Sequence, residues 1–188
     1  MTNIVIIGGG PAGYEAALAA AAYGADITVI DSDGIGGACV LWDCVPSKTF
    51  IASTGIRTEI RRAADLGISL ETDHTTVALS QIHQRVRDLA FAQSADIRSR
   101  LISEGVRLVS GSARPEPTQT GVRSHNVVAT LADGTTETYS GEVILIATGA
   151  SPRILPDAQP DGERILTWRQ LYDLDELPEH LIVIGSGV

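Results

Sequence analysis

The chain has 188 residues, a net charge of −9, an apolar content of 44% and a charged content of 20%. This composition is typical of a globular protein, and the length favours one domain with some residues to spare. The negative charge argues against nucleic acids and anionic membranes as partners, because both require a basic surface. The longest apolar stretch, residues 16–23, is far shorter than the ~20 residues of a membrane span. Because no basic targeting segment precedes residue 3, we expect a cytosolic protein.

The N-terminal part of the chain predicts a complete strand–turn–helix–strand unit. A helix of small residues, ended by Gly24, lies between two short apolar runs. Two strands joined through a helix pair in parallel with a right-handed crossover. The expected elements are a strand at 3–7, a turn at 8–13, a helix at 12–23 and a strand at 27–30 that leads into Asp31.

After this unit the regular alternation of strands and helices breaks. A glycine-rich loop at 31–38 precedes a helical pattern at 39–64, which Pro46 disturbs. A polar stretch at 65–76 separates this helix from a second one at 79–104. The second helix has apolar residues at helical spacing, so we expect the two helices to pair as a hairpin inserted into the sheet domain. Its apolar positions are Leu79, Ile82, Val86, Leu89, Ile97 and Leu101.

The remaining residues predict mostly strands. The dipeptide Asp133-Gly134 joins strands expected at 126–131 and 135–139, which is a strong hairpin signal. The run 143–146 is entirely apolar and therefore indicates a central strand. Further strands are expected at 106–109 and, buried, at 181–184, with a linker containing Pro152, Pro156 and Pro160 before the last one. The predicted fold class is α/β, with a Rossmann-like parallel sheet, a helical hairpin insertion and an antiparallel β-meander.

The segment from Gly8 to Gly13 matches the dinucleotide-binding pattern G-x-G-x-x-G, with a strand before it and a helix after it. In this pattern Gly8 permits the tight turn, Gly10 lets a pyrophosphate approach the backbone, and Gly13 lets the helix pack on the strand. The helix N-terminus, which includes Pro11 and Ala12, supplies N–H donors and a positive dipole end. The alternative is a glycine-rich turn without a ligand, which the surrounding strand and helix make less favourable.

The acidic residue that the pattern requires about twenty positions on is Asp31, placed to accept a hydrogen bond from a ribose hydroxyl. The pattern alone does not separate FAD from NAD. A simple dehydrogenase would add another strand–helix unit soon after Asp31, whereas here ~75 residues of loop and helix intervene. That insertion favours FAD, because the isoalloxazine ring needs an extra wall.

Cys39 and Cys44 are five positions apart. On a regular helix this spacing gives a rise of about 7.5 Å and a rotation of ~140°, whereas a disulfide requires Cα atoms within about 6.8 Å. Either the cysteines stay unpaired, or the helix start is distorted so that Cys39 comes close to Cys44. A bridge formed by distortion would be strained and reducible, as a catalytic disulfide should be.

The neighbours of the second cysteine act in opposite directions on its reactivity. Lys48 lies one turn after Cys44 and could lower its thiol pKa, whereas the negative charge of Asp43 would raise it. The alternative interpretation is a pair of buried, inert cysteines, because free cysteine is among the most buried residue types.

The segment 36–48 resembles the active-site helix of the pyridine nucleotide-disulfide oxidoreductases, the family of lipoamide dehydrogenase, glutathione reductase and mercuric reductase. The shared pattern is two glycines, a small residue, Cys, four residues, Cys, a branched apolar residue, Pro, Ser and Lys. The first glycine fingerprint, the run Ala147-Thr148-Gly149 with Pro152-Arg153 after it, and the pair Gly185 and Gly187 follow in the family's order. The resemblance covers the whole chain.

The resemblance implies roles for individual residues. Cys44 would be the thiol that faces the flavin, Cys39 the thiol that exchanges with substrate, and Lys48 would lie near flavin N5. Gly185 and Gly187 would begin an NAD(P) site. The residues expected to contact FAD are Gly8, Gly10, Pro11, Ala12, Gly13, Asp31, Ser32, Gly37, Ala38, Lys48, Gly111, Ala113, Ala147, Thr148 and Gly149.

The chain also departs from the family pattern. Ala38 replaces a usual Thr, and Trp42-Asp43 replaces smaller residues before the second cysteine. This variant resembles an actinobacterial subgroup whose members are lipoamide-dehydrogenase-like and similar to NAD(P)H-quinone reductases. In that subgroup the cysteine pair can be incomplete, so the resemblance implies that the disulfide is not essential there.

No other cluster indicates chemistry. His74, His83, His125 and His180 have no metal-ligand spacing and are interpreted as solvated surface residues, so no metal is expected. Arg57, Arg61 and Arg62 have helical spacing and are interpreted as a solvated helix face, or alternatively as a contact to the nucleotide end of a cofactor.

Three functions remain open. The first is an FAD-dependent reductase that passes hydride from NAD(P)H to a quinone, and the second is a dihydrolipoyl dehydrogenase or other disulfide reductase. The third is an FAD-binding module without catalysis. We expect an N-terminal fragment of a homodimeric enzyme, with an FAD-binding domain at 1–150, a linker at 151–178 and the start of an NAD(P)-binding domain at 179–188.

Overall fold

The computed structural model of the protein describes residues 1–70, 76–117, 121 and 123–185. The chain divides into two compact units. The first comprises residues 1–49 and 86–151, and the second comprises residues 50–85 and 152–188. Among the described residues, no helix is both long and apolar enough to cross a bilayer.

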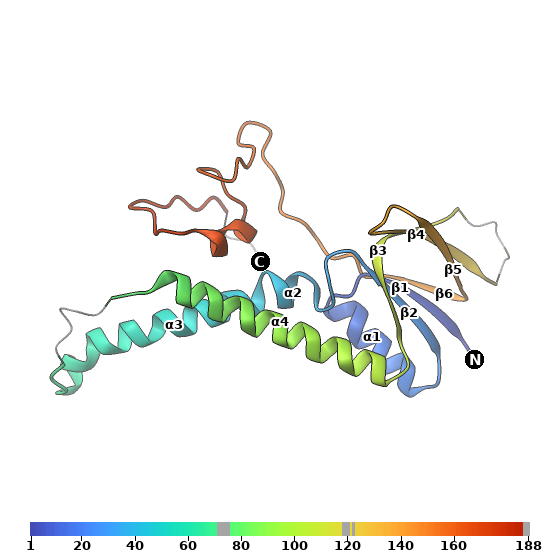
Figure 1. The fold of residues 1–188 in the computed structure, drawn as a ribbon, viewed down its shortest axis with the longest axis horizontal. Coiled ribbons are helices and arrows are strands. Elements are labelled where there is room, and N and C mark those ends of the chain that lie inside the picture. The colour runs from blue at the N-terminus through green and yellow to red at the C-terminus, as the bar shows by residue number, and fades with distance from the viewer. Residues whose placement is uncertain (71–75, 118–120, 122, 186–188) are drawn as a thin grey trace. The chain divides into compact units, whose positions relative to one another are not determined.

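The first unit contains one six-stranded sheet (Figure 1), in the order β5-β4-β3-β2-β1-β6. Strands β6, β1, β2 and the first part of β3 run parallel, and β3, β4 and β5 continue as an antiparallel meander. The α/β fold with a parallel sheet and a meander is therefore confirmed. The strands are β1 (Asn3–Ile7), β2 (Asp26–Asp31), β3 (Arg107–Pro115), β4 (His125–Leu131), β5 (Thr136–Gly141) and β6 (Val143–Ile146).

The helices follow the expected order. The predicted strand–turn–helix–strand unit is confirmed, since β1 and β2 pair in parallel and α1 lies between them in sequence. The helices are α1 (Pro11–Ala22), α2 (Gly37–Leu41), α3 (Cys44–Arg62) and α4 (Leu79–Ser103), with 3-10 turns η1 (Ala63–Leu66) and η2 (Trp168–Asp173).

Alternating residues of β1 enter two different cores. Ile6 packs with Ala17 of α1 and Leu101 of α4 on the helical face of the sheet. Val5 and Ile7, the residues on either side of Ile6, pack on the opposite face, where residues of the meander cover them. Because successive side chains of a strand point to opposite faces, this one short strand joins the helical layer to the meander and holds the turn that follows it in place.

The position of the helix break differs from the prediction. Pro46 is buried in the first turn of α3 and the helix continues past it. The first turn tolerates proline, because the N–H that proline lacks has no acceptor within the helix there. The break lies instead at Trp42 and Asp43, between α2 and α3.

The predicted hairpin is confirmed, with β4 and β5 pairing antiparallel around Asp133-Gly134. The side chain of Asp133 accepts hydrogen bonds from the backbone N–H and the hydroxyl of Thr135, and these bonds lower the pKa of its carboxyl group. Strand β3 is longer than predicted. It pairs in parallel with β2 up to Ser110 and antiparallel with β4 from Gly111 onward.

Two predicted buried strands differ from the structure. Strand β6 is at the sheet edge, not in its centre, and Ile146 is 64% exposed. Residues 181–184 form no strand, and their exposed fractions run from 55% to 79%. An apolar run becomes a buried strand only where neighbouring strands flank it and layers cover it. Within the described residues, 143–146 has one neighbouring strand and 181–184 has none.

Helix α4 is confirmed, but its buried stripe is rotated from the predicted one. Leu89 is 40% exposed, whereas Ala90 is 2% exposed. The buried residues His83, Val86, Ala90, Ile97 and Leu101 follow one helical face. The stripe therefore includes a histidine, which corrects the interpretation of His83 as a solvated residue.

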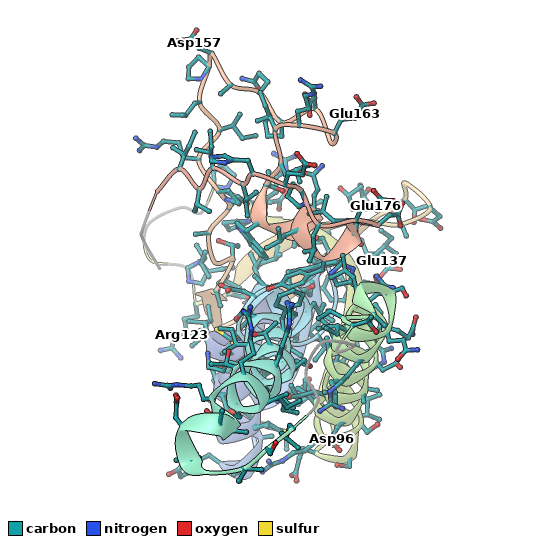
Figure 2. All side chains as sticks on the ribbon, turned by 90° about the vertical axis from the view of Figure 1, so that its left-hand side faces the viewer. Asp96, Arg123, Glu137, Asp157, Glu163 and Glu176 are labelled. Atoms are coloured by element: carbon teal, nitrogen blue, oxygen red, sulfur yellow. The ribbon has the colours of Figure 1, made fainter. Side chains whose placement is uncertain are left out.

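In the second unit, the ring of Phe50 lies 6.0 Å from the ring of His83 and 6.2 Å from that of Tyr172, measured between centroids. The carboxylate of Asp161 accepts three backbone N–H groups and closes an exposed loop. The side chains of Asp157 and Glu163 project outward from this segment (Figure 2).

Candidate functional site

Two glycines shape the turn between β1 and α1. Gly8 has φ +110°, and a Cβ there would overlap the carbonyl oxygen of Ala147. A Cβ on Gly13 would overlap the carbonyl oxygen of Gly8. Both positions therefore require glycine for reasons of space, which matches the expected tight turn and the expected close packing of the helix on the strand.

The N-terminus of α1 is open to a ligand. Gly10 caps the helix with no side-chain hydrogen bond, and a Cβ built on it would find nothing nearer than the Cα of Gly37 at 3.9 Å. The N–H groups of Ala12 and Gly13, in the first turn, have no acceptor within the helix. Backbone donors at a positive dipole end with open space before them suit a phosphate, so this turn fits the pyrophosphate of a dinucleotide.

The carboxylate of Asp31 accepts three backbone hydrogen bonds. Its Oδ2 accepts from the N–H of Gly9 at 2.6 Å, and its Oδ1 accepts from the N–H groups of Asp33 at 2.8 Å and Gly34 at 2.6 Å. Asp31 thereby joins the turn after β1 to the loop after β2. A carboxylate oxygen has two acceptor positions, so Oδ2 keeps one for the predicted ribose hydroxyl.

Other predicted cofactor residues border the same region. Ser110, which immediately precedes Gly111, pairs with Asp31 across β2 and β3. Ala113 pairs with Ala129 in the meander. The backbone N–H of Ala147 donates to the carbonyl of Ile7 at 2.8 Å, and the backbone nitrogen of Thr148 lies 3.1 Å from where a Cβ on Gly8 would be. Gly149 follows directly in sequence. Their contacts to a cofactor remain predictions.

The two cysteines lie next to each other because the helix breaks between them. The N–H groups of Trp42 and Asp43 both donate to the carbonyl of Ala38, at 2.9 and 2.8 Å, and this closes α2. The carbonyl of Asp43 then accepts from the N–H of Ser47 as α3 begins. Cys39 and Cys44 are both free thiols, and they lie close enough that Cys44 raises the pKa of Cys39. The distorted helix start is thus present, without a disulfide.

Several groups act on the thiol of Cys39. Burial raises its pKa most, followed by the hydrogen bond and the charge of Cys44 and then the charge of Asp43, while Lys48 lowers it. The raising effects win, so the protonated thiol of Cys39 is favoured in the folded chain. Lys48 itself is exposed on α3, and its predicted place near flavin N5 remains a prediction.

The remaining predicted residues are scattered. Ser32 is exposed beside Asp31, and Ala38 is half-buried in α2. Gly185 lies in the exposed C-terminal segment of the second unit, and Gly187 lies outside the described residues. The structure therefore brings the FAD candidates and the cysteines into the first unit, and places Gly185 in the second.

The prediction that the histidines and three arginines are solvated is confirmed for some of them and wrong for others. His83 is 4% exposed, His125 is half-buried in β4 and His180 is exposed, while His74 lies outside the described residues. Across the part of the chain that the structure describes, no group of three or more metal-ligating side chains is assembled. The three arginines are exposed as expected. Two of them, Arg57 and Arg61, also line a cavity of about 260 Å³ within the second unit.

Two residues of this region were not predicted from the sequence. Tyr14 of α1 lies close enough to Cys39 for the thiolate charge to raise its pKa, after burial and the charge of Glu15. Ser94 of α4 donates its hydroxyl to the carbonyl of Ile35 at 2.5 Å, across 59 positions of sequence. The available signal for Ser94 is its place on the buried stripe of α4, where a polar residue interrupts apolar ones.

The family model for pyridine nucleotide-disulphide oxidoreductases matches residues 2–188. The chain belongs to this family. Its membership agrees with the strand, glycine turn, helix and cysteine pair described above, and it confirms the resemblance drawn from residues 36–48.

The chain is similar to curated relatives over its full length. It is 62% identical to an NAD(P)H dehydrogenase (quinone) of Mycobacterium tuberculosis, over 100% of this chain and 39% of the relative. It is 32% identical to a dihydrolipoyl dehydrogenase of Chlorobaculum tepidum, over 98% of this chain and 38% of the relative. The chain thus spans about two-fifths of the length of these relatives.

A solved structure also resembles this chain. The crystal structure of LpdA from Mycobacterium tuberculosis superposes with a TM-score of 0.88 at 60% sequence identity. The match covers 96% of this chain and 39% of that one. The fold described here is therefore that of the corresponding part of LpdA.

Proposed function

We propose that the protein carrying this chain is an FAD-dependent oxidoreductase that passes hydride equivalents from NAD(P)H to a quinone. The observation that carries the proposal is the 62% identity, along the whole chain, to a relative named NAD(P)H dehydrogenase (quinone). The relative named dihydrolipoyl dehydrogenase is half as similar, at 32% identity.

The residues of the first unit would hold the FAD. The turn at Gly8 to Gly13 would bind the pyrophosphate through backbone N–H groups, and the free acceptor position on Asp31 would take a ribose hydroxyl. When bound, FAD supplies the redox chemistry between NAD(P)H and the acceptor, while the protein positions and tunes it. Lys48, one turn after Cys44, would lie near flavin N5, as the family resemblance implies. We also expect the protein to be a cytosolic homodimer.

The cysteine pair favours a second candidate function, which is disulfide reduction. Cys44 acts on the pKa of Cys39, and the helix break between them is the distortion that the formation of a disulfide between these two thiols would require. Electrons would then leave through the two thiols to a disulfide substrate, as in a dihydrolipoyl dehydrogenase.

One set of assays on the purified full-length protein separates the two functions. The wild type, Cys44→Ser and Cys39→Ser would each be assayed for reduction of a soluble naphthoquinone with NADH and NADPH. Each would also be assayed for oxidation of dihydrolipoamide with NAD. Quinone reduction should persist in both variants within about threefold of the wild type, because the hydride route to a quinone does not pass through the thiols.

The proposal is wrong if quinone reduction falls a hundredfold in Cys44→Ser while dihydrolipoamide oxidation by the wild type is fast. Ser53→Ala, at a hydroxyl on the same helix nine residues after Cys44, serves as the control for unspecific effects of substitution. A full-length protein that purifies without flavin and does not bind added FAD would exclude both functions.

A further inference from the structure

Two glycine-containing loops meet in front of α1. The first is the turn at 8–10, and the second is the loop at 34–37. The N–H of Gly36 donates to the carbonyl of Gly9 at 2.8 Å. A Cβ on Gly37 would lie 2.7 Å from the Cα of Gly10. The backbone of the second loop therefore forms one side of the open space at the N-terminus of α1.

The second loop is held from both of its sides. Asp31 binds the N–H of Gly34 on one side, at 2.6 Å. Ser94 donates its hydroxyl to the carbonyl of Ile35 on the other side, at 2.5 Å. The side chain of Ile35 is 6% exposed and enters the core cluster that contains Ile97 of α4. The loop is thus held by one carboxylate, one hydroxyl and one buried apolar side chain.

Packing alone does not explain the serine. Ser94 is half-buried on the stripe of α4 between Ala90 and Ile97, where an alanine has nearly the same size and is a better helix former. A serine hydroxyl in mid-helix can instead bond to a carbonyl of its own helix. Ser99 does this, donating to the carbonyl of Ala95 at 2.9 Å. Ser94 donates out of its helix to the glycine loop.

We propose that Ser94 is a positioning residue for the cofactor, because its hydroxyl fixes Ile35 and thereby places Gly36 and Gly37 against the turn that receives the pyrophosphate. This inference rests on the proposed FAD site. Without the hydroxyl, the hydrogen bond from α4 to the carbonyl of Ile35 is lost. The loop then gains conformational freedom, which FAD binding must remove. Pre-organisation of this kind increases affinity by lowering the ordering cost of binding.

The test uses the full-length protein, with FAD removed and added back. The dissociation constant for FAD would be measured by calorimetry for the wild type, Ser94→Ala, Ser94→Thr and the matched control Ser99→Ala. We expect Ser94→Ala to bind FAD about tenfold more weakly, equivalent to ~1.4 kcal/mol. Ser94→Thr keeps the hydroxyl and should bind within about threefold of the wild type, as should Ser99→Ala.

Thermal unfolding distinguishes positioning from a general loss of stability. A ligand that binds only the folded state raises the melting temperature according to its affinity. If Ser94 positions the loop, the rise caused by FAD should be smaller in Ser94→Ala than in the wild type. If Ser94 is only structural, the apo and loaded forms should lose equal stability and the rise should stay the same, which would overturn the proposal.

The outcomes remain separable from those of the proposed function. A wild type that binds no FAD contradicts the proposed function, and the inference with it. A wild type that binds FAD, with Ser94→Ala binding equally well, contradicts the inference alone. Should Ser94→Ala not fold, Ser94→Cys keeps a similar size with a weaker donor and must show the same direction of change in FAD affinity.

Discussion

At the residue scale, the reactivity of Cys39 depends on what the helix break brings near it. Cys44, Asp43 and Lys48 are all within nine positions of it in sequence, yet their directions of action are visible only in the folded chain. The sequence predicted that Lys48 would lower the thiol pKa of Cys44, and that stays a prediction; in the structure the charge of Lys48 acts to lower the pKa of Cys39. Burial of that thiol is a tertiary effect, and it is the largest of the causes that raise its pKa.

We expect Cys44→Ala to shift the alkylation of Cys39 to lower pH. The substitution removes the hydrogen bond and the charge that follow burial among the causes of the raised pKa. Alkylation of Cys39 by iodoacetamide, followed against pH by mass spectrometry of its peptide, measures this shift. Lys48→Met should move the alkylation curve in the opposite direction, because it removes the charge that lowers the pKa.

The same raised pKa has a consequence for stability. A thiol whose pKa is higher in the folded state than in the unfolded state stabilises the fold below the ordinary thiol pKa, and this stabilisation is lost as the pH rises through the raised value.

The alkylation experiment can also contradict the prediction. An alkylation curve for Cys39 that does not differ between the wild type and Cys44→Ala would show that the two thiols are not coupled.

At the element scale, helix α1 depends on its contact with the turn before it. A Cβ on Gly13 would overlap the backbone of Gly8, so the helix would have to move away from β1. Gly55 of α3 is a matched case, because nothing lies within 4 Å of a Cβ built there. A side chain is therefore excluded at Gly13 by the neighbouring backbone, whereas the space at Gly55 is open to one.

We therefore predict opposite effects of two alanine substitutions. Gly13→Ala should lower the free energy of unfolding by about 3 kcal/mol or more, because overpacking at backbone cannot relax through side chains. Gly55→Ala should raise it by about 0.5–1 kcal/mol, because alanine loses less backbone entropy in a helix. Urea unfolding of both variants and the wild type measures the difference. Equal effects at the two sites would contradict the packing described for α1.

Helix α4 shows the limit of reading an amphipathic pattern from sequence. Its extent was predicted within one residue, because a period of 3.6 persists over many turns. The predicted buried face included Leu89, which is exposed in the structure, and it left out the buried His83. A pattern of apolar residues cannot show which polar side chains are buried against other elements. His83 lies on this face opposite the ring of Phe50, and Ser94 lies on it with its hydroxyl bonded to the carbonyl of Ile35.

At the scale of the whole molecule, the candidate cofactor residues are not spread over both units. Every predicted FAD contact lies in the first unit, whose segments are 1–49 and 86–151. The second unit contains the cavity that Arg57 and Arg61 line, together with Gly185. Binding of FAD should therefore stabilise one unit in particular, since a ligand stabilises the elements that contact it.

Hydrogen exchange can test this distribution in the full-length protein. Adding FAD to the apo form should slow amide exchange most in residues 8–14 and 34–38, because these carry the glycine turn and the loop beside it. Residues 152–185 should change least. Protection spread equally over both ranges, measured by mass spectrometry of peptides, would contradict an FAD site confined to the first unit.

The sequence by itself determined the local elements and the chemistry they offer. The glycine turn, α1, Asp31 and the β4–β5 hairpin each depend on signals within a few residues, namely glycine spacing, periodicity and turn dipeptides. The cysteine spacing offered two alternatives, which were unpaired thiols or a distorted helix start that brings Cys39 close to Cys44. The tertiary structure combines features of both, because the helix is interrupted at Trp42 and Asp43 while both thiols are free.

Tertiary structure also decided what each element packs against. Strand β6 carries the apolar run of a central strand but lies at the sheet edge, because burial depends on neighbours that a single segment cannot specify. The carboxylate of Asp31 binds three backbone N–H groups, and Ser94 reaches Ile35 over 59 positions. Such contacts form only when distant segments are folded together, and for this reason local sequence patterns did not reveal them.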